Sequence, residues 1–323
     1  QEQLLIEAAM ILTALDAMYT RGEYQYLIKS LTLFIPTMLA HCWYEEGEFQ
    51  LERAGAEALK RHDNVTLAKI YLYLGKTQHG MGRRQEALAT WSKGIVLPQE
   101  DTSIKCDLFF AHCWALYMNG EYASLAPYLQ EALLLAFRSH YDEVYCGLLR
   151  IRAFVEHNQG NYVQAEQDLL QGLSIAVTLK NRAELPLYYL GLSARPARRG
   201  DYDQAEIYYQ KGIEAARQAG DEQTECVLLI YRVTTYTMTP SPALRHDLNY
   251  ALNIAKKTKN LGYYALILRY WSTFEFAMGD LREAEKRAEE GLPYAVQLTS
   301  PRLEGMFLTC LAQVALAKGH VEK

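Results

Sequence analysis

Four arginines, Arg150, Arg195, Arg198 and Arg269, lie among aromatic residues on three of the helices that the sequence predicts. A guanidinium group binds a carboxylate or a phosphate through two parallel hydrogen bonds. Aromatic rings add apolar contact area at binding surfaces. This combination predicts a site for an anionic or polar ligand, or for a partner peptide.

Catalytic and metal-binding motifs are not evident in the sequence. Nothing matches the phosphate-binding pattern GxxxxGK[ST], the zinc pattern HExxH or a nucleophile elbow. The eight histidines are spread along the chain, and the six cysteines form no CxxC pair, so neither a zinc site nor a disulfide framework is indicated. We therefore predict a protein that is not an enzyme and that carries no metal and no cofactor.

Composition restricts the partners and the compartment. The formal net charge of −5 gives no general basic surface for nucleic acid. No apolar run is long enough to span a membrane, and no secretory signal begins the chain. Unpaired cysteines are typical of a reducing compartment. We predict a cytoplasmic protein that binds neither a membrane nor nucleic acid directly.

A repeated segment organises the elements that would position these side chains. GNYVQAEQDLLQGLSIA at 160–176 returns as GDYDQAEIYYQKGIEAA at 200–216 and as GDLREAEKRAEEGLPYA from residue 279. Turns recur at about 40-residue intervals, near residues 82, 120, 160, 200, 240, 279 and 319. A fixed period of this kind indicates a repeat architecture.

Each position of the repeated segment has a physical reason. The turn glycine can adopt the positive φ that ends a helix. The small residue five positions later, and the Gly or Ala twelve positions later, let neighbouring helices approach closely, as at Ala165, Gly172, Gly212 and Gly291. One pair of helices cannot bury its apolar face alone, so neighbouring pairs must stack to form the core.

We predict about seven to eight antiparallel helix pairs, in which a first (A) helix precedes each turn and a second (B) helix follows it. Residues 1–64 are expected to form N-terminal helices that lead into the repeats as an arm. Residues 65–323 are expected to form the repeats themselves. Because the sequence begins without Met and stops at Lys323, just past the turn at Gly319, we expect a fragment whose last repeat is truncated.

The pattern resembles the tetratricopeptide repeat. The shared features are a small residue in helix A, Gly at the turn, Tyr two later, Ala five later and a small residue near the end. The resemblance implies an all-α fold, a right-handed superhelix (α-solenoid) whose A helices line a concave groove. The period near 40 residues departs from the usual repeat of about 34 residues.

Groove-facing positions on the A helices follow from counting back from each turn, and the irregular repeats add further candidates. The predicted binding residues are Trp114, Tyr117, Arg150, Phe154, His157, Arg195, Arg198, Tyr231, Tyr236, Arg269, Thr273 and Phe276. The alternative for each is an ordinary core or solvent-facing role.

Two repeats break the pattern, and such departures are where function is expected. Pro196 falls inside a predicted A helix, where it either kinks the helix beside Arg195 and Arg198 or ends it one turn early. In the other repeat, Thr-Pro-Ser-Pro at 239–242 replaces the turn glycine, after a polar and aromatic stretch that includes Tyr231 and Tyr236.

A second resemblance lies in residues 32–64, in the run Trp43-Tyr44-Glu45-Glu46-Gly47 followed by LERAGAEALKRHDN. It is similar to the start of the repeats in STAND-type signalling ATPases, which include bacterial regulators related to the maltose activator and NB-ARC-related proteins. The resemblance implies a sensor that binds a protein or small-molecule inducer in its groove, with an ATPase module upstream of Gln1. The alternative is a repeat scaffold for protein–protein interaction that binds no small molecule.

Overall fold

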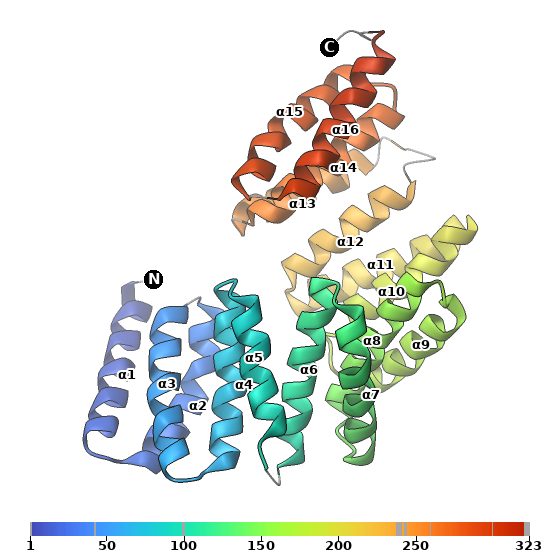
Figure 1. Ribbon diagram of the computed structural model, residues 1–323. Coiled ribbons are helices and arrows are strands. Elements are labelled where there is room, and N and C mark those ends of the chain that lie inside the picture. The colour runs from blue at the N-terminus through green and yellow to red at the C-terminus, as the bar shows by residue number, and fades with distance from the viewer. Residues whose placement is uncertain are drawn as a thin grey trace. The chain divides into compact units, whose positions relative to one another are not determined.

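The structure is a computed structural model that describes residues 2–41, 43–98, 101–236, 241, 244–258, 260–298 and 300–319. Within these ranges there are sixteen α-helices and no strand (Figure 1). Contacts divide the chain into two compact units, Gln1–Gln159 and Gly160–Lys323.

The first unit contains eight helices. They are α1 (Glu2–Thr20), α2 (Tyr24–Ala40), α3 (Tyr44–Lys60), α4 (Asn64–Gly80), α5 (Arg84–Val96), α6 (Thr102–Asn119), α7 (Tyr122–Arg138) and α8 (Asp142–Gln159). Helices α4, α6 and α8 are the A helices of this unit. Each packs against the B helix before it, and α4 and α6 also pack against the next A helix.

The second unit also contains eight helices. They are α9 (Tyr162–Thr178), α10 (Leu185–Arg199), α11 (Tyr202–Ala219), α12 (Glu222–Thr235), α13 (Leu244–Lys257), α14 (Leu261–Ala277), α15 (Leu281–Gln297) and α16 (Pro301–Ala317). Here the A helices α10, α12, α14 and α16 lie side by side in sequence order, with a B helix packed between consecutive ones. The predicted all-α arrangement of stacked helix pairs is confirmed.

Helix boundaries match the repeated segment. The turn residues Gly160 and Gly279 have φ values of 89° and 83°, the left-handed conformation that a side chain would strain. Side-chain oxygens of Asp101, Asp221 and Asn260 accept hydrogen bonds from backbone N–H groups in the first turns of α6, α12 and α14. Such caps stabilise a helix start by about 1 kcal/mol each and fix where the A helices begin.

The glycine twelve residues after a turn receives a large side chain from the next A helix. A Cβ at Gly172 would lie 2.5 Å from the Tyr188 ring, and one at Gly291 would lie 2.2 Å from the Phe307 ring. The side chains of Tyr188 and Phe307 are both fully buried. The close approach predicted for these small residues is confirmed.

The prolines inside helices do not end them. Helix α2 continues through Pro36, and α10 continues through Pro196 to Arg199, where Gly200 ends it with φ 76°. The interpretation that Pro196 ends its helix one turn early is therefore wrong. Of the Thr-Pro-Ser-Pro segment, 239, 240 and 242 lie outside the described residues. The boundary at 64/65 stays a prediction, and α3 packs directly against α4.

Candidate ligand-binding surfaces

Four of the predicted residues come together in the first unit. The ring of Tyr117 lies 5.7 Å from Trp114 on α6 and 5.8 Å from Phe154 on α8. The Arg150 guanidinium carbon lies 5.1 Å from the Trp114 ring centre and 5.8 Å from that of Phe154. These four side chains form what we call the aromatic cluster.

Helix geometry and a glycine bring the cluster together. Arg150 and Phe154 are four residues apart on α8, so they share one face, as do Trp114 and Tyr117 on α6. Helix α8 can approach α6 because Gly147 has no side chain. A Cβ at Gly147 would lie 2.6 Å from the ring of Phe110 on α6. The absence of one methyl group therefore determines how near the two halves of the cluster lie.

The rings of the cluster are partly exposed, whereas Arg150 is only 3% exposed. Tyr122 extends the row, with its ring 6.1 Å from Tyr117, and its hydroxyl accepts a hydrogen bond of 3.1 Å from Asn158. His157 follows Phe154 by one turn and is partly exposed. Partly exposed rings above a buried cation offer apolar contact area together with cation–π stabilisation.

Helices α4 and α6 each carry a charged residue, Lys76 and Asp107, whose charges act on each other. The Lys76 side chain is exposed, yet desolvation by the surrounding protein lowers the pKa of its ammonium group, and the charge of Asp107 opposes that shift. Burial raises the pKa of Asp107, whose carboxylate accepts a hydrogen bond of 3.2 Å from Tyr141. Sequence reasoning missed Asp107, although an acidic residue between Cys106 and Leu108 on a largely apolar helix was a usable signal.

In the second unit, the arginines beside Pro196 contact α9. Arg195 forms an ion pair with Glu166, and the Arg198 guanidinium carbon lies 4.5 Å from the ring centre of Tyr162. Arg198 is exposed, whereas Arg195 is partly buried. The Arg195 charge is therefore already neutralised within the protein.

Tyr236 packs between helices. Its hydroxyl group donates to the Tyr202 carbonyl oxygen at 2.9 Å and to Glu206 at 3.1 Å. Burial, followed by the Glu206 charge, raises the pKa of this phenol. Neighbouring Arg232 donates to both Glu206 and Asp247. These contacts hold α12 to α11 and α13, which gives this part of the irregular repeat a structural role.

The other predicted residues of the second unit lie on α12 and α14. Tyr231 is 53% exposed, and Phe276 is partly exposed. The Arg269 guanidinium carbon lies 4.5 Å from the ring centre of Tyr270. The Thr273 hydroxyl group hydrogen-bonds to the Arg269 carbonyl oxygen at 3.2 Å and lies 3.7 Å from the Cys310 sulfur, so it ties α14 to α16.

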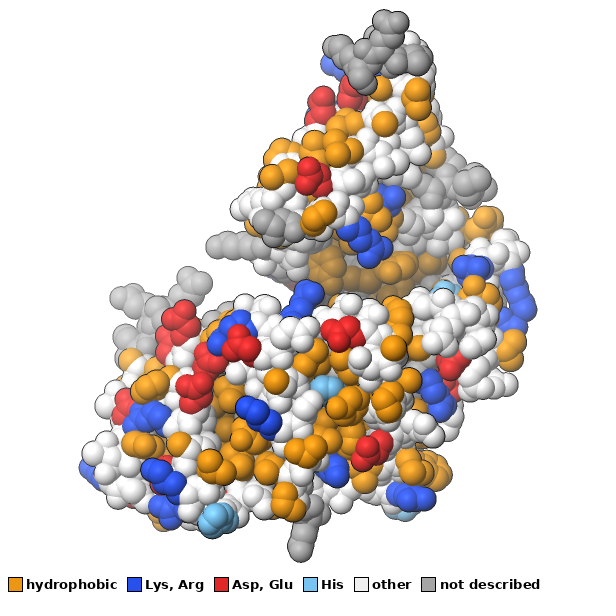
Figure 2. Space-filling model, viewed as in Figure 1, with side chains coloured by type: hydrophobic (Ala, Val, Ile, Leu, Met, Phe, Trp, Pro, Cys, Tyr) orange, Lys and Arg blue, Asp and Glu red, His pale blue; other side chains and the backbone are white. Residues whose placement is uncertain are grey.

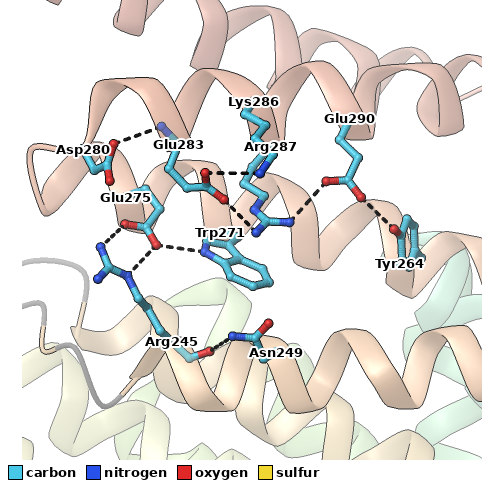
Figure 3. A network of polar contacts seen from close by, with 10 residues as sticks. All are labelled: Arg245, Asn249, Tyr264, Trp271, Glu275, Asp280, Glu283, Lys286, Arg287 and Glu290. Atoms are coloured by element: carbon cyan, nitrogen blue, oxygen red, sulfur yellow. Dashed lines mark hydrogen bonds and ion pairs between the residues drawn. The ribbon is translucent and has the colours of Figure 1, made fainter.

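A network of polar contacts connects α14 to its neighbours α13 and α15 (Figure 3). Arg245 on α13 donates to both carboxylate oxygens of Glu275, at 2.8 and 2.6 Å, and Trp271 donates to one of them at 2.9 Å. The Arg287 guanidinium lies 3.9 Å from the Trp271 ring centre and pairs with Glu283 and Glu290. Glu275 is 1% exposed, so a charge without these partners would be costly there. Sequence reasoning did not find this network.

The surface of the molecule shows where its hydrophobic side chains are exposed. In Figure 2, hydrophobic side chains gather over α4 to α8, with basic side chains among them.

In the described ranges, no three His, Cys, Asp or Glu side chains are placed to hold a metal ion. No helix within those ranges has the length and apolar character needed to cross a membrane.

Comparison with solved structures places the fold. A STAND protein with a tetratricopeptide repeat sensor from Pyrococcus horikoshii matches with TM-score 0.66 and 16% identity, over 98% of this chain and 48% of its own. The apo form of RapI matches with TM-score 0.68 and 13% identity, over 86% and 99%. The Rap conjugation gene regulator of plasmid pLS20, in complex with the Phr* peptide, matches with TM-score 0.60 and 11% identity, over 97% of each chain.

This chain spans about half the length of the STAND protein. No protein-family model and no curated protein matches the sequence. At these identities the likeness concerns the fold. The fold is a tetratricopeptide-repeat-like superhelix, as the repeated segment predicted.

Proposed function

We propose that this chain is the sensor domain of a STAND-type signalling ATPase and that it binds a polypeptide segment on the aromatic cluster. One observation carries the proposal: Trp114 and Tyr117 of α6 meet Phe154 and Arg150 of α8 as partly exposed rings around a buried cation. Large aromatic groups and arginine are the residues that most often dominate binding energy at protein interfaces.

The chemistry of the cluster fits a peptide with an apolar or aromatic anchor residue. Rings on two successive A helices can contact both sides of such a residue, and removing an anchoring aromatic contact typically costs about 2 kcal/mol or more. The exposed ammonium group of Lys76 on α4 and the carboxyl group of Asp107 on α6 add charged groups to these A helices. Charged groups at the rim of an interface contribute mainly to specificity and to the association rate.

Two of the comparisons support this function. One similar structure is a STAND protein whose sensor is made of tetratricopeptide repeats, and another is a Rap regulator in complex with a peptide. In a sensor of this kind, the peptide binds one state of the full protein more tightly than the other. Binding then shifts the population toward that state and changes the output of the ATPase module.

Selection from a random peptide library tests the binding role. Peptides enriched on the folded chain should bind it in calorimetry, and Trp114→Ala and Phe154→Ala should each weaken binding at least about tenfold, equivalent to about 1.4 kcal/mol. Phe137→Ala is the matched control, because Phe137 is an aromatic residue on B helix α7 that is 62% exposed. Failure to enrich any peptide, or equal weakening by all three variants, would contradict the proposal.

The gene sequence upstream of Gln1 tests the STAND assignment separately. We expect a nucleotide-binding module there with a GxxxxGK[ST] loop, which would bind the phosphates of ATP. A coding sequence without such a module would contradict the STAND assignment. It would favour the alternative, a repeat scaffold for protein–protein interaction. Peptide binding on the aromatic cluster would remain valid in that case.

A further inference from the structure

A cavity of about 300 Å³ lies between α7 and α8. Its wall on α7 contains Leu125, Leu129 and Leu133, which follow one another at intervals of four residues and so share one face of the helix. Helix α8 contributes the charged side chains of Arg152 and Glu156. Cavities of this size, lined by apolar side chains and a few polar groups, are typical of small-molecule sites.

The cavity lies on a different side of α8 from the aromatic cluster. Arg150 and Phe154 contact rings of α6, whereas Arg152 and Glu156 line the cavity together with α7. Side chains that are two residues apart in a helix lie on different faces. The cavity is therefore a second surface, separate from the aromatic cluster.

The second unit repeats this pair of helices in the same register. Helix α7 packs against α8, and α13 packs against α14. Counting back four residues from Gly160 and from Gly279 gives Glu156 on α8 and Glu275 on α14. The same alignment pairs the three leucines of α7 with buried leucines of α13, which are Leu244, Leu248 and Leu252.

Larger side chains occupy the corresponding space in the second unit. They are Arg245, Trp271 and Phe274, and Figure 3 shows Arg245 and Trp271 against Glu275. Trp271 and Phe274 are 3% and 0% exposed, so they are part of the core there. The corresponding residues of the first unit are smaller, and they are Ala126, Arg152 and Val155. The smaller side chains account for the cavity between α7 and α8.

The contacts in the second unit indicate which chemistry suits the cavity. Arg245 donates to both carboxylate oxygens of Glu275, at 2.8 and 2.6 Å, and the Trp271 indole N–H donates to one of them at 2.9 Å. Glu156 has the equivalent position on α8, where Ala126 has no side-chain donor to offer it. A carboxylate has about four acceptor sites, so Glu156 can accept a further hydrogen bond.

We propose that the cavity between α7 and α8 binds a planar aromatic molecule that carries an N–H donor. Its ring lies against the leucines of α7, in the space that Arg245 and Trp271 occupy in the second unit, and its N–H group donates to Glu156. Apolar contact and a charge-assisted hydrogen bond together supply the affinity. The site involves only the first unit and does not depend on peptide binding by the aromatic cluster.

Titration of the whole chain with indole and with benzofuran tests the site. The two molecules have nearly the same shape, but benzofuran has an oxygen atom where indole has its N–H group. Binding is followed through the backbone amide signals of α7 and α8 in NMR spectra. We expect saturable binding of indole, and we expect benzofuran to bind at least about threefold more weakly because it cannot donate to Glu156.

Variants that fill the cavity provide the second test. Ala126→Arg introduces the side chain that α13 has in Arg245, and it should abolish indole binding. Because Ala126 is exposed, this change should not prevent folding. Val155→Phe introduces the side chain of Phe274 and should also abolish binding. Ala123→Arg is the matched control, because Ala123 is exposed on the same helix and does not line the cavity, so this variant should bind indole as the wild type does.

Glu156→Gln tests the hydrogen bond, because the amide keeps the shape of the carboxyl group without its charge. It should weaken indole binding at least about threefold and leave benzofuran binding unchanged. Trp114→Ala should leave the binding of both molecules unchanged.

Four results would overturn the proposal. They are the absence of saturable shifts in α7 and α8 with indole, equal affinities for indole and benzofuran, equal weakening by Ala126→Arg and Ala123→Arg, and loss of indole binding in Trp114→Ala. A failure of peptide selection on the aromatic cluster would leave this titration unaffected, so the two proposals can fail separately.

Discussion

Replacing Gly291 by alanine should destabilise the second unit, although alanine is the better helix former. The added Cβ would lie 2.2 Å from Cζ and 2.4 Å from Cε1 of Phe307, and 3.2 Å from the Cβ of Leu268. Phe307 is fully buried, so its ring cannot move into solvent without losing its packing. Helices α15 and α16 must separate instead.

The size of the effect follows from two opposing terms. Alanine gains about 1 kcal/mol of helix propensity over glycine. Overpacking a well-packed site typically costs about 1–3 kcal/mol, and an overlap with a fixed ring belongs at the upper end or beyond it. We expect a net loss of about 2 kcal/mol in the free energy of unfolding, which corresponds to a decrease in Tm of about 4–8 °C.

Thermal unfolding measures the loss in the free energy of unfolding, and hydrogen exchange of the α15 and α16 amides shows where it occurs. Both are needed because repeat proteins do not always unfold in one step. Gly305→Ala is the control: a Cβ there meets nothing within 4 Å, so it should stabilise α16 by about 0.5–1 kcal/mol. In a Phe307→Ala background, Gly291→Ala should become stabilising. If Gly291→Ala destabilises equally in both backgrounds, contact with Phe307 is not the cause.

Three further predictions concern burial, ion pairing and the aromatic cluster. Burial lowers the pKa of His112 from 6.5 to about 4, so the unfolded chain takes up the proton first and the free energy of unfolding should fall by about 2 kcal/mol between pH 7 and pH 5. Urea unfolding of His112→Gln should show a weaker pH dependence, and an unchanged dependence would exclude His112 as its source. Glu275→Gln should cost about 1–3 kcal/mol, whereas Lys286→Gln, which breaks an exposed pair, should cost at most about 0.5 kcal/mol in the same assay. Gly147→Ala should separate Phe154 from Tyr117 and weaken peptide binding at least about threefold, and wild-type affinity would show that the spacing between α6 and α8 is unimportant.

Most of the fold could be predicted because the repeat encodes it locally. The positive φ of Gly160 and the close packing at Gly172 each need one residue type at one position, and the period repeats that requirement along the chain. Pro196 was harder to interpret. The sequence shows a residue that disfavours a helix, but α10 still continues for three residues beyond it.

The candidate site was only partly predictable. Counting back from the turns placed Trp114 and Phe154 on adjacent A helices, and the structure brings their rings together through Tyr117. Counting from the turns could not predict the ion pairs. The partners of Arg195 and Arg245 lie on neighbouring helices, about 30 residues away in the sequence. The packing of whole helices therefore decides which arginines are neutralised and which, like Arg269, have no carboxylate partner among the described residues.

Fluorine NMR of the chain labelled with 5-fluorotryptophan tests the proposed function most directly. The sequence has four tryptophans, of which Trp91 and Trp271 are only 2% and 3% exposed, whereas Trp114 is partly exposed in the aromatic cluster. When the tightest peptide from the selection is added, the Trp114 signal should shift in proportion to occupancy, and the Trp91 and Trp271 signals should stay in place. Saturating binding without any change at Trp114 would contradict the proposal that the aromatic cluster receives the peptide.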